Sequence, residues 1–151
     1  MTGELLSLSL KVIGVVRGGV KQRPEPGWEG TVSEIVVDSH LTEALDGLEE
    51  FSHIIVIYWM HKASALGKVA TKVHPRGRRE LPLVGFFAAR TPYRLNPVGA
   101  TTVRLLERRG NILKVEGLDA IDGTPVIDIK PYIPGYDSVT EAKVPSWVTR
   151  L

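Results

Sequence analysis

The sequence of 151 residues contains no cysteine, and this absence excludes several kinds of site at once. Without a thiol the chain has no disulfide, no thiolate metal ligand and no cysteine nucleophile. Apolar runs are short as well, because the longest, residues 54–60, has the length of a strand and not of a bilayer span. A basic n-region typical of a signal peptide is also missing. We therefore expect a cytoplasmic protein with no membrane association.

Common nucleotide and metal motifs are missing too. No G-x-G-x-x-G follows an apolar strand, and there is no P-loop, H-E-x-x-H or G-x-S-x-G. The histidines have no spacing typical of metal ligands; they are His40, His53, His61 and His74. Rossmann-type cofactor binding, NTP hydrolysis and zinc catalysis are therefore not indicated, and we expect no metal.

Short strands separated by Gly and Pro dominate what is present. Strand-like patterns cover residues 8–16, 31–37, 53–60, 83–89, 101–106, 112–115 and 124–130. Residues 43–51 form a short amphipathic helix candidate, with Thr42 as a candidate N-cap. Arg109-Gly110-Asn111 lies between two strands and predicts a hairpin turn. The pattern predicts one domain, residues 1–151, that is mainly β, closed or sandwich-like, with few short helices.

Charge is unevenly distributed along the chain, although the net charge is only +2. Residues 61–114 hold twelve Lys and Arg against two acidic residues, while the flanks hold seven against fifteen. A basic block of this kind is typical of a polyanion partner such as nucleic acid. A solvated surface that pairs with the acidic flanks is the alternative, and charge alone does not decide between them.

Two polar clusters follow apolar strands. Residues 17–21 (RGGVK) contain paired glycines, which let a ligand approach the backbone, although a plain turn is the simpler interpretation of this segment alone. Residues 90–99 (RTPYRLNPVG) combine two arginines and a tyrosine with two prolines that stiffen the loop. An arginine held at a strand end suits a carboxylate or phosphate, so the second cluster favours function.

A third cluster spreads several aspartates over residues 117–137. Asp122-Gly123-Thr124-Pro125 has the composition of a turn that Asp122 can cap. From Val126 onward, strand alternation predicts Val126, Asp128 and Lys130 on one face and residues 127 and 129 on the other. Asp128 and Lys130 are then expected to pair, either beside a cleft or on a half-exposed strand.

These clusters resemble a known family. "RTPYRLNPVG" followed by "GLDAIDGTPVIDIKPY" closely resembles the signature of the TrmO family, also called TsaA-like. "IGVVR", "LDGLEEFSHIIVIYWMHK" and "GFFAAR" resemble the family pattern in its order, so the resemblance covers nearly the whole chain. It implies a small, non-Rossmann, β-barrel-like fold and a homodimer. It also implies S-adenosylmethionine-dependent methylation of N6 of threonylcarbamoylated adenosine, just 3′ of the tRNA anticodon.

The resemblance also implies which residues form the site. Cofactor contacts are expected from Gly18, Gly19, Val20, His61, Lys62, Arg90, Ala100, Gly117, Leu118, Asp119 and Ala120. Arg90 is expected to meet the carboxylate of the cofactor, and Asp119 its ribose or ammonium group. The reaction-side face is expected to comprise Arg94, Asn96, Asp128, Lys130 and Tyr132, with Asp128, Asp122 or Tyr132 accepting the proton. Binding of tRNA phosphates is expected from Lys72, Arg76, Arg78 and Arg79.

The sequence departs from the family pattern at several points. Arg17-Gly18-Gly19 stands where the family usually has Arg-Ser-Pro, which keeps backbone contacts but not side-chain contacts, and Leu95 stands where proline is common. Many bacterial members carry a further C-terminal domain, so the basic segment, or a different set of tRNAs, is expected to account for substrate recognition here. Two alternatives stay open: an S-adenosylmethionine-dependent enzyme of this fold with another acceptor, and a non-catalytic tRNA-binding module.

Overall fold

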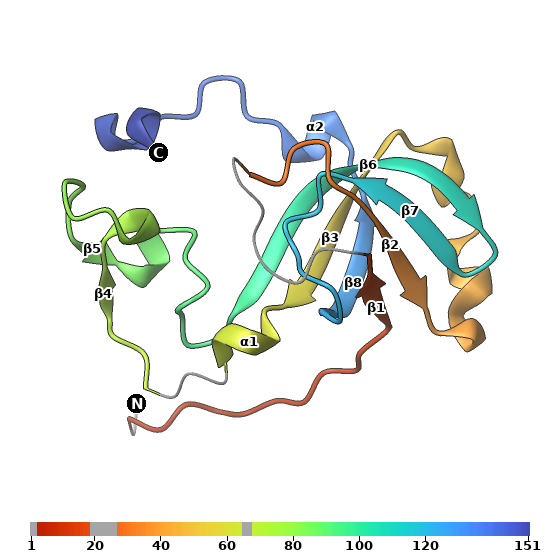
Figure 1. Ribbon diagram of the computed structural model, residues 1–151, viewed down its shortest axis with the longest axis horizontal. Coiled ribbons are helices and arrows are strands. Elements are labelled where there is room, and N and C mark those ends of the chain that lie inside the picture. The colour runs from red at the N-terminus through yellow and green to blue at the C-terminus, as the bar shows by residue number, and fades with distance from the viewer. Residues whose placement is uncertain (1–2, 19–26, 65–67) are drawn as a thin grey trace.

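Antiparallel strands close into a barrel in the order β1-β2-β7-β6-β3-β8, and β8 pairs back onto β1 (Figure 1). The computed structural model describes residues 3–18, 27–64 and 68–151. The barrel strands are β1 (Gly14–Arg17), β2 (Val32–Val37), β3 (His53–Trp59), β6 (Val98–Arg109), β7 (Ile112–Glu116) and β8 (Pro125–Pro131). The prediction of a mainly β, barrel-like, non-Rossmann fold is confirmed.

Smaller elements surround the barrel. They are the two-stranded sheet β4 (Lys72–Val73) and β5 (Val84–Gly85), the one-turn helices α1 (His61–Ser64) and α2 (Pro134–Asp137), and 3-10 turns at Ser39–Leu45, Leu48–Glu50, Pro75–Gly77, Phe86–Ala88 and Ser146–Arg150. Figure 1 shows the β4–β5 sheet and the C-terminal turn together on one side of the barrel. Within the described part of the chain, every helix is too short to cross a bilayer.

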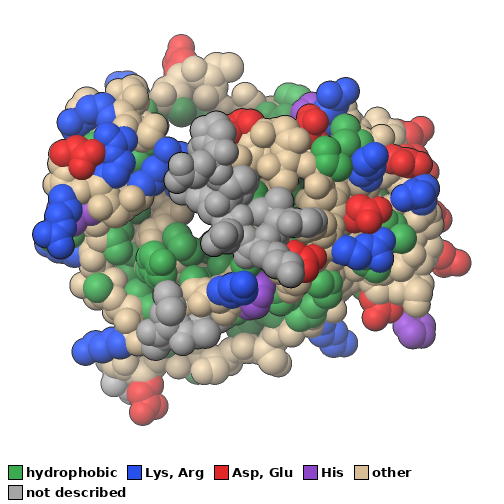
Figure 2. Space-filling model, viewed as in Figure 1, with side chains coloured by type: hydrophobic (Ala, Val, Ile, Leu, Met, Phe, Trp, Pro, Cys, Tyr) green, Lys and Arg blue, Asp and Glu red, His purple; other side chains and the backbone are tan. Residues whose placement is uncertain are grey.

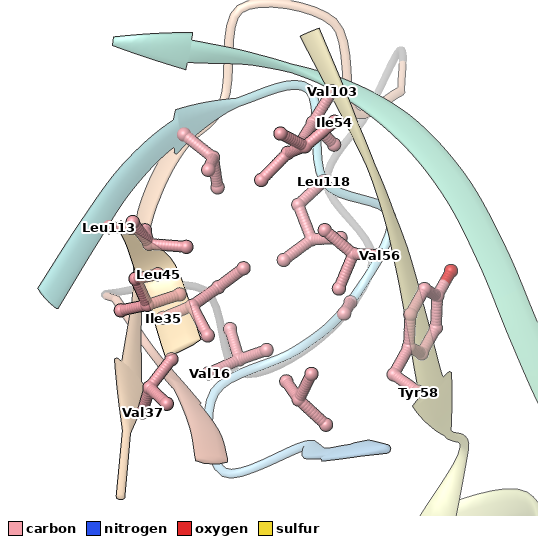
Figure 3. Packing of buried hydrophobic residues seen from close by; sticks show 13 residues of the cluster. Val16, Ile35, Val37, Leu45, Ile54, Val56, Tyr58, Val103, Leu113 and Leu118 are labelled. Carbon is pink, nitrogen blue, oxygen red and sulfur yellow. The ribbon is translucent and has the colours of Figure 1, made fainter. Parts of the chain in front are cut away.

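Alternation along the strands fills the barrel with aliphatic side chains. On β3, Ile54, Val56 and Tyr58 are buried and point inward, whereas the residues between them are only half-buried. Figure 3 shows the inward side chains meeting at the barrel axis, with the Tyr58 hydroxyl at the margin of the cluster. The buried cluster consists of Val16, Ile35, Val37, Leu45, Ile54, Val56, Tyr58, Val103, Leu113, Val115, Leu118, Ala120 and Val126.

The hairpin prediction is confirmed. β6 and β7 pair antiparallel with Arg109 opposite Ile112, which leaves Gly110 and Asn111 as a two-residue loop. Gly110 has a φ of 58°, as the first central residue of a type II′ turn requires, and glycine adopts this conformation without steric cost. The Asn111 side-chain amide donates a 2.6 Å hydrogen bond to the carbonyl of Val37, which joins the turn to β2.

The predictions of a helix over residues 43–51 and of two long strands are wrong in detail. Two 3-10 turns replace the helix, because Gly47 takes a φ of 89° between them and interrupts the helical backbone. The cap is Asp38, whose carboxylate accepts a hydrogen bond from the amide of His40. The expected strand 8–16 begins only at Gly14, and within the expected strand 83–89 only β5 is extended before a 3-10 turn.

The prediction that Val126 shares a face with Asp128 and Lys130 is also wrong. The register between β3 and β8 shifts by one residue, so that Tyr58 lies opposite Val126 while Ile57 lies opposite Asp128. Residues directly opposite each other on paired strands share a face, and a β-bulge adds one residue to one strand. Val126 therefore faces the core with Tyr58, whereas Asp128 lies on the outer face with Ile57. Lys130 still shares the face of Asp128, as expected.

Candidate functional site

One end of the barrel is organised around the hydroxyl of Tyr58. This hydroxyl donates a 2.6 Å hydrogen bond to the backbone carbonyl of Asp119, and therefore accepts the 2.9 Å bond from the hydroxyl of Thr101. Tyr58 is only 3% exposed, and this burial raises its pKa to about 12. The phenol is thus a neutral hydrogen-bond donor at any physiological pH, and it joins β3 to the segment after β7.

The ring of Tyr58 has room because the residue opposite it on β6 is a glycine without a side chain. Gly99 on β6 lies opposite Tyr58, and a Cβ built at Gly99 would overlap the phenol ring at Cε2 and Cζ. The "NPVG" sequence that precedes the body of β6 therefore serves a close approach of ring and backbone. Glycine at this point gives room for an aromatic residue in a barrel otherwise filled by aliphatic ones.

The segment from Gly117 to Ala120 closes this end of the barrel. Gly117 turns the chain with a φ of 90°, and its amide donates to the carbonyl of Thr31 at 2.8 Å. Leu118 and Ala120 are buried in the core, whereas the side chain of Asp119 lies at the surface. The buried side chains anchor the turn, so the backbone of Gly117 and the carboxylate of Asp119 are the groups that it presents outward.

Arg90 lies in the same neighbourhood. Its guanidinium donates a 3.2 Å hydrogen bond to the carbonyl of Ala100 on β6. Beyond burial and the Thr101 bond, the Asp119 carboxylate raises the pKa of Tyr58 and the Arg90 guanidinium lowers it. The charges of Arg90 and Asp119 are therefore both close to one hydroxyl. The fold thus brings Asp119, from the segment after β7, close to Arg90 and Ala100.

A pocket of about 570 Å³ opens beside this cluster, which is large enough for a nucleoside-sized ligand. The barrel contributes Thr102, Gly117 and Asp119 to its lining. Loops contribute the other lining residues, which are Gly27, Trp28, Glu29, Arg76 and Leu151. Figure 2 shows this face of the molecule hollowed between the barrel and the smaller part that carries β4 and β5.

Sequence reasoning missed several of these lining residues. Trp28, Glu29, Thr102 and Leu151 reach the pocket only through long-range folding, and no local pattern marks the last three of them. The only local signal is at Trp28, an indole in a polar, glycine-rich loop where no core position requires it. Among the described residues no group of three or more His, Asp or Glu side chains is placed to hold a metal ion.

The first glycine loop is tied to the third polar cluster. The amide of Gly18 donates a 3.1 Å hydrogen bond to the carboxylate of Asp122, a residue 104 positions away. The Asp122–Gly123 turn itself forms as expected, with a φ of 85° at Gly123 and a Thr124 hydroxyl bond of 2.7 Å to Ile121. The amide of Gly18 is therefore engaged within the chain. Gly19 and Val20 lie outside the described residues.

His61 and Lys62 begin α1 directly after β3, so the Tyr58 end of the barrel also carries these two expected cofactor residues. His61 is half-buried and Lys62 is exposed. The chain enters this turn through a 2.7 Å hydrogen bond from the amide of Met60 to the carbonyl of Pro97. The turn and the 90–99 loop are thus directly joined.

The expected reaction-side residues divide into two groups. Asp128 and Lys130 form an ion pair of 3.0 Å on the outer face of β8, where Asp128 lies opposite Ile57 and Ile57 lies opposite Ala100. Two strand spacings therefore separate Asp128 from Ala100, or about 10 Å. Tyr132 follows on the same strand end, with its ring 6.4 Å from that of His53 in an edge-to-face arrangement.

Arg94 and Asn96 lie in the proline-stiffened loop. The Arg94 guanidinium donates to the carbonyls of Ala89 and Thr91 at 2.9 and 3.1 Å, so it braces the loop from within. Asn96 is exposed. The arginine of the loop thus braces it from within, in addition to the two prolines.

A second hollow, of about 380 Å³, lies between the two 3-10 turns after β2 and the outer end of β8. Its lining includes Leu45, Phe51, Ile129 and Pro131, and none of the expected site residues reaches it. We therefore place the site at the Tyr58 end of the barrel.

A closed antiparallel barrel with a polar pocket at one end defines a class of protein distinct from Rossmann-type nucleotide binders. In this class the ligand groups come from strand ends and loops, and not from a glycine-rich turn before a helix.

Comparison with known proteins identifies the family within this class. The family model of the tRNA-methyltransferase O N-terminal domain matches residues 21–138. A probable S-adenosyl-L-methionine-binding protein of Methanothermobacter thermautotrophicus is 45% identical over 138 residues, which are 89% of this chain and 96% of that protein. The chain belongs to the TrmO family.

Longer relatives share the same region. The tRNA (adenine(37)-N6)-methyltransferase of Escherichia coli is 36% identical over 90% of this chain and 62% of its own length. The crystal structure of TrmO from Pseudomonas aeruginosa superposes with a TM-score of 0.73 and 31% identity, covering 93% of this chain and 62% of that one. The chain thus spans less than two thirds of these two proteins.

Proposed function

We propose that this protein is an S-adenosylmethionine-dependent methyltransferase that acts on tRNA, at N6 of the adenosine just 3′ of the anticodon. We further propose that this adenosine carries the threonylcarbamoyl group. The observation that carries the proposal is the convergence of Arg90, Ala100, Gly117 and Asp119 beside one pocket. Two relatives, a probable S-adenosyl-L-methionine-binding protein and a tRNA (adenine(37)-N6)-methyltransferase, support the same chemistry.

The groups in and around the pocket fit the cofactor. S-adenosylmethionine, when bound, supplies an electrophilic methyl group. Arg90 would hold the carboxylate of the cofactor through its guanidinium, and Asp119 would accept hydrogen bonds from ribose hydroxyls or from the ammonium group. The carbonyl of Gly117 would accept a hydrogen bond from the base, because the Gly117 amide already donates to Thr31 and Leu118 is fully buried. Burial of Leu118 and Ala120 fixes the position of this backbone. His61 and Lys62 at the start of α1 are further proposed contacts.

The acceptor amine must lose a proton during the transfer. Asp128 is our proposed acceptor of this proton, on the outer face of β8 with Lys130 beside it. Both carboxylate oxygens of Asp128 are already engaged, one by Lys130 and one by the amide of Ile129 at 2.9 Å. Positioning of the two substrates, and not covalent catalysis, is the main contribution that this arrangement makes.

RNA binding is proposed for the arm that carries β4 and the loop after it. Lys and Arg side chains gather over this part of the molecule in Figure 2. Of the expected phosphate-binding residues, Lys72 and Arg79 belong to it, whereas Arg78 is already paired with Glu80. Binding that depends on such contacts falls steeply as salt rises. We also propose a homodimer, because Leu6, Leu8 and Leu10 of the N-terminal segment are 101%, 79% and 53% exposed in the single chain.

The test uses purified protein, labelled S-adenosylmethionine and two tRNA pools, one with and one without the threonylcarbamoyl modification. Nucleosides from the digested tRNA are then identified by mass spectrometry. We expect labelled methyl-threonylcarbamoyladenosine from the first pool only. Label in neither pool, with cofactor binding shown by calorimetry, would overturn the tRNA assignment. Salt-sensitive tRNA binding without cofactor binding would instead indicate a non-catalytic module.

A further inference from the structure

Arg76 occupies an unusual place in the basic loop, because it lines the pocket together with Trp28 and Asp119. From the sequence alone, Arg76 is expected to bind tRNA phosphates together with Arg78 and Arg79. The loop that carries it is internally braced: the amide of Gly77 donates to His74, the amide of Arg78 to Pro75, and the His74 ring contacts the carbonyl of Leu81 at 2.9 Å. Arg76 is therefore held by a turn that has its own internal hydrogen bonds, and not by an unbraced surface loop.

The backbone of Arg76 supports a functional role for this placement. Its φ of 53° is the one left-handed value at a non-glycine residue in the described part of the chain. A residue other than glycine pays about 1 kcal/mol or more for this conformation, and such strain concentrates at ligand sites. Gly77, the next residue, has a φ of 68° and would accept the same conformation without cost. An arginine is nevertheless held where the chain lines the pocket.

The neighbouring arginine differs from Arg76 in its partners. Arg78 is committed to the protein, since it pairs with Glu80 at 2.6 Å and donates to the carbonyl of Arg150. Within residues 3–18, 27–64 and 68–151, no hydrogen bond or ion pair of the Arg76 side chain is found. Its charge is therefore available to a ligand.

The charges of the pocket indicate what kind of ligand group Arg76 binds. Glu29 and Asp119 are the acidic lining residues, and Arg76 is the basic one. Acidic groups suit the hydroxyls and ammonium group of the cofactor, whereas a guanidinium suits a planar carboxylate that it can bind in bidentate fashion. Arg90, which donates to the carbonyl of Ala100 on the barrel side, is the residue proposed above for the carboxylate of the cofactor.

We propose that Arg76 binds the carboxylate of the acceptor, that is, of the threonyl group on N6 of the adenosine, and so determines substrate specificity. This inference rests on the proposed function. The acceptor substituent then lies on the loop side of the pocket, with Trp28 and Arg76. The cofactor lies on the barrel side, with Thr102, Gly117 and Asp119. The protein would then require the threonylcarbamoyl group because the Arg76 guanidinium binds the carboxylate of that group.

The experiment compares two anticodon stem-loops. One carries threonylcarbamoyladenosine, and the other carries the same substituent with the carboxylate reduced to an alcohol. Methyl transfer is measured as kcat/KM for the wild-type protein, for Arg76→Gln, and for Arg79→Gln as a matched control. Arg79 lies three residues away, is exposed and does not line the pocket, and its replacement removes the same charge.

We expect the wild-type protein to prefer the carboxylate substrate by about 10- to 100-fold, as for a charge-assisted hydrogen-bonded pair. Arg76→Gln should abolish this preference while leaving turnover of the alcohol substrate near the wild-type value. Arg79→Gln should retain the preference, even if both substrates bind more weakly. Calorimetry with S-adenosylmethionine should give the same Kd for Arg76→Gln as for the wild type, which also shows that the variant is folded.

Three results would overturn the inference. A preference retained in Arg76→Gln would exclude Arg76 as the specificity residue. A Kd for S-adenosylmethionine raised tenfold or more in Arg76→Gln would assign Arg76 to the cofactor instead. If the wild-type protein binds S-adenosylmethionine but methylates neither stem-loop, the proposed function itself fails and the inference fails with it.

Discussion

The two ends of β6 show how one strand serves two purposes. At the hairpin end, Arg108 is 13% exposed and donates to Asp46, to Glu49 and to the carbonyls of Thr42 and Gly110. At the other end, Gly99 makes room for Tyr58, whose hydroxyl reaches Asp119. Both ends carry polar groups that are at least partly buried, but only the second borders the pocket of about 570 Å³ where the expected cofactor residues meet. At the hairpin end the polar bonds bind parts of the chain to each other, and at the other they hold groups ready for a ligand.

The largest effect is expected where backbone and ring meet. Gly99→Ala should lower the free energy of unfolding by about 1–3 kcal/mol and weaken S-adenosylmethionine binding, because the new Cβ displaces Tyr58 and with it the Asp119 turn. Denaturant unfolding and calorimetry measure the two effects. Gly85→Ala is the control, since its nearest neighbour would be 3.9 Å away and little change is expected. Equal effects of the two substitutions would contradict the role of Gly99.

Arg108→Ala tests the hairpin end. It should lower the denaturation midpoint clearly, because four partners lose one guanidinium, and it should leave the affinity for S-adenosylmethionine unchanged. The hydrogen bond to Asp46 is the main cause that raises the pKa of Arg108, so its charge persists at every accessible pH. Arg109→Ala, at a side chain 65% exposed, should have a smaller effect on the midpoint. Loss of cofactor affinity in folded Arg108→Ala would show that the two ends are coupled.

Tyr58→Phe sharpens the comparison at the site end. Removal of the hydroxyl should cost about 1–2 kcal/mol of unfolding free energy and reduce cofactor affinity several-fold, since the carbonyl of Asp119 loses its donor. The effect also depends on pH. In the unfolded chain Tyr58 ionises near 10.0, whereas in the folded chain its pKa is about 12.

The folded state therefore retains the proton that the unfolded state loses in this interval, and wild-type stability falls as pH rises from 10 to 12. Below pH 10 the contribution is fully present. Relative to Tyr58→Phe, the wild type should lose roughly 2–3 kcal/mol over those two units. Unfolding curves at several pH values measure this, with Tyr136→Phe, at a side chain 83% exposed, as the control. Parallel pH profiles of the wild type and Tyr58→Phe would contradict the buried phenol.

The smallest effect on stability is expected at the outer face of β8. The Asp128–Lys130 pair has side chains 48% and 61% exposed, so Asp128→Asn should change the free energy of unfolding by less than about 1 kcal/mol. If Asp128 takes the proton, kcat should fall by at least tenfold while the Kd for S-adenosylmethionine stays constant. Unchanged kcat would exclude Asp128 from that role, and Lys130→Gln separates the effect of the pair from that of the carboxylate.

Sequence patterns were sufficient where the structure depends on neighbours in the chain. The hairpin at Gly110 and the turn at Gly123 follow from local composition, and the continuous apolar run marks β3 as a strand. Patterns were insufficient where pairing with a distant strand determines which way a side chain points. The facing of Val126 depends on a register shift against Ile57 and Tyr58, and nothing in the sequence of β8 marks it.

The site was predicted in the same uneven way. Arg90, Gly117 and Asp119 lie in motifs that can be recognised in short segments of the sequence. The fold brings these residues to one end of the barrel. Trp28 and Thr102 reach the same pocket from a loop and from the middle of a strand, where no motif marks them. The left-handed backbone of Arg76 is likewise invisible in sequence, because arginine is not a residue from which that conformation is expected.

The bulge in β8 also determines where this chain tolerates a change in length. Ile127 is the additional residue, since Val126 and Asp128 lie opposite adjacent residues of β3. Deletion of Ile127 would make the ladder regular and would leave Val126 inward and Asp128 outward, as they are now. Deletion of Ile129 would instead turn Lys130 toward the barrel interior. A one-residue deletion in this strand is therefore compatible with the fold at Ile127 and disruptive at Ile129.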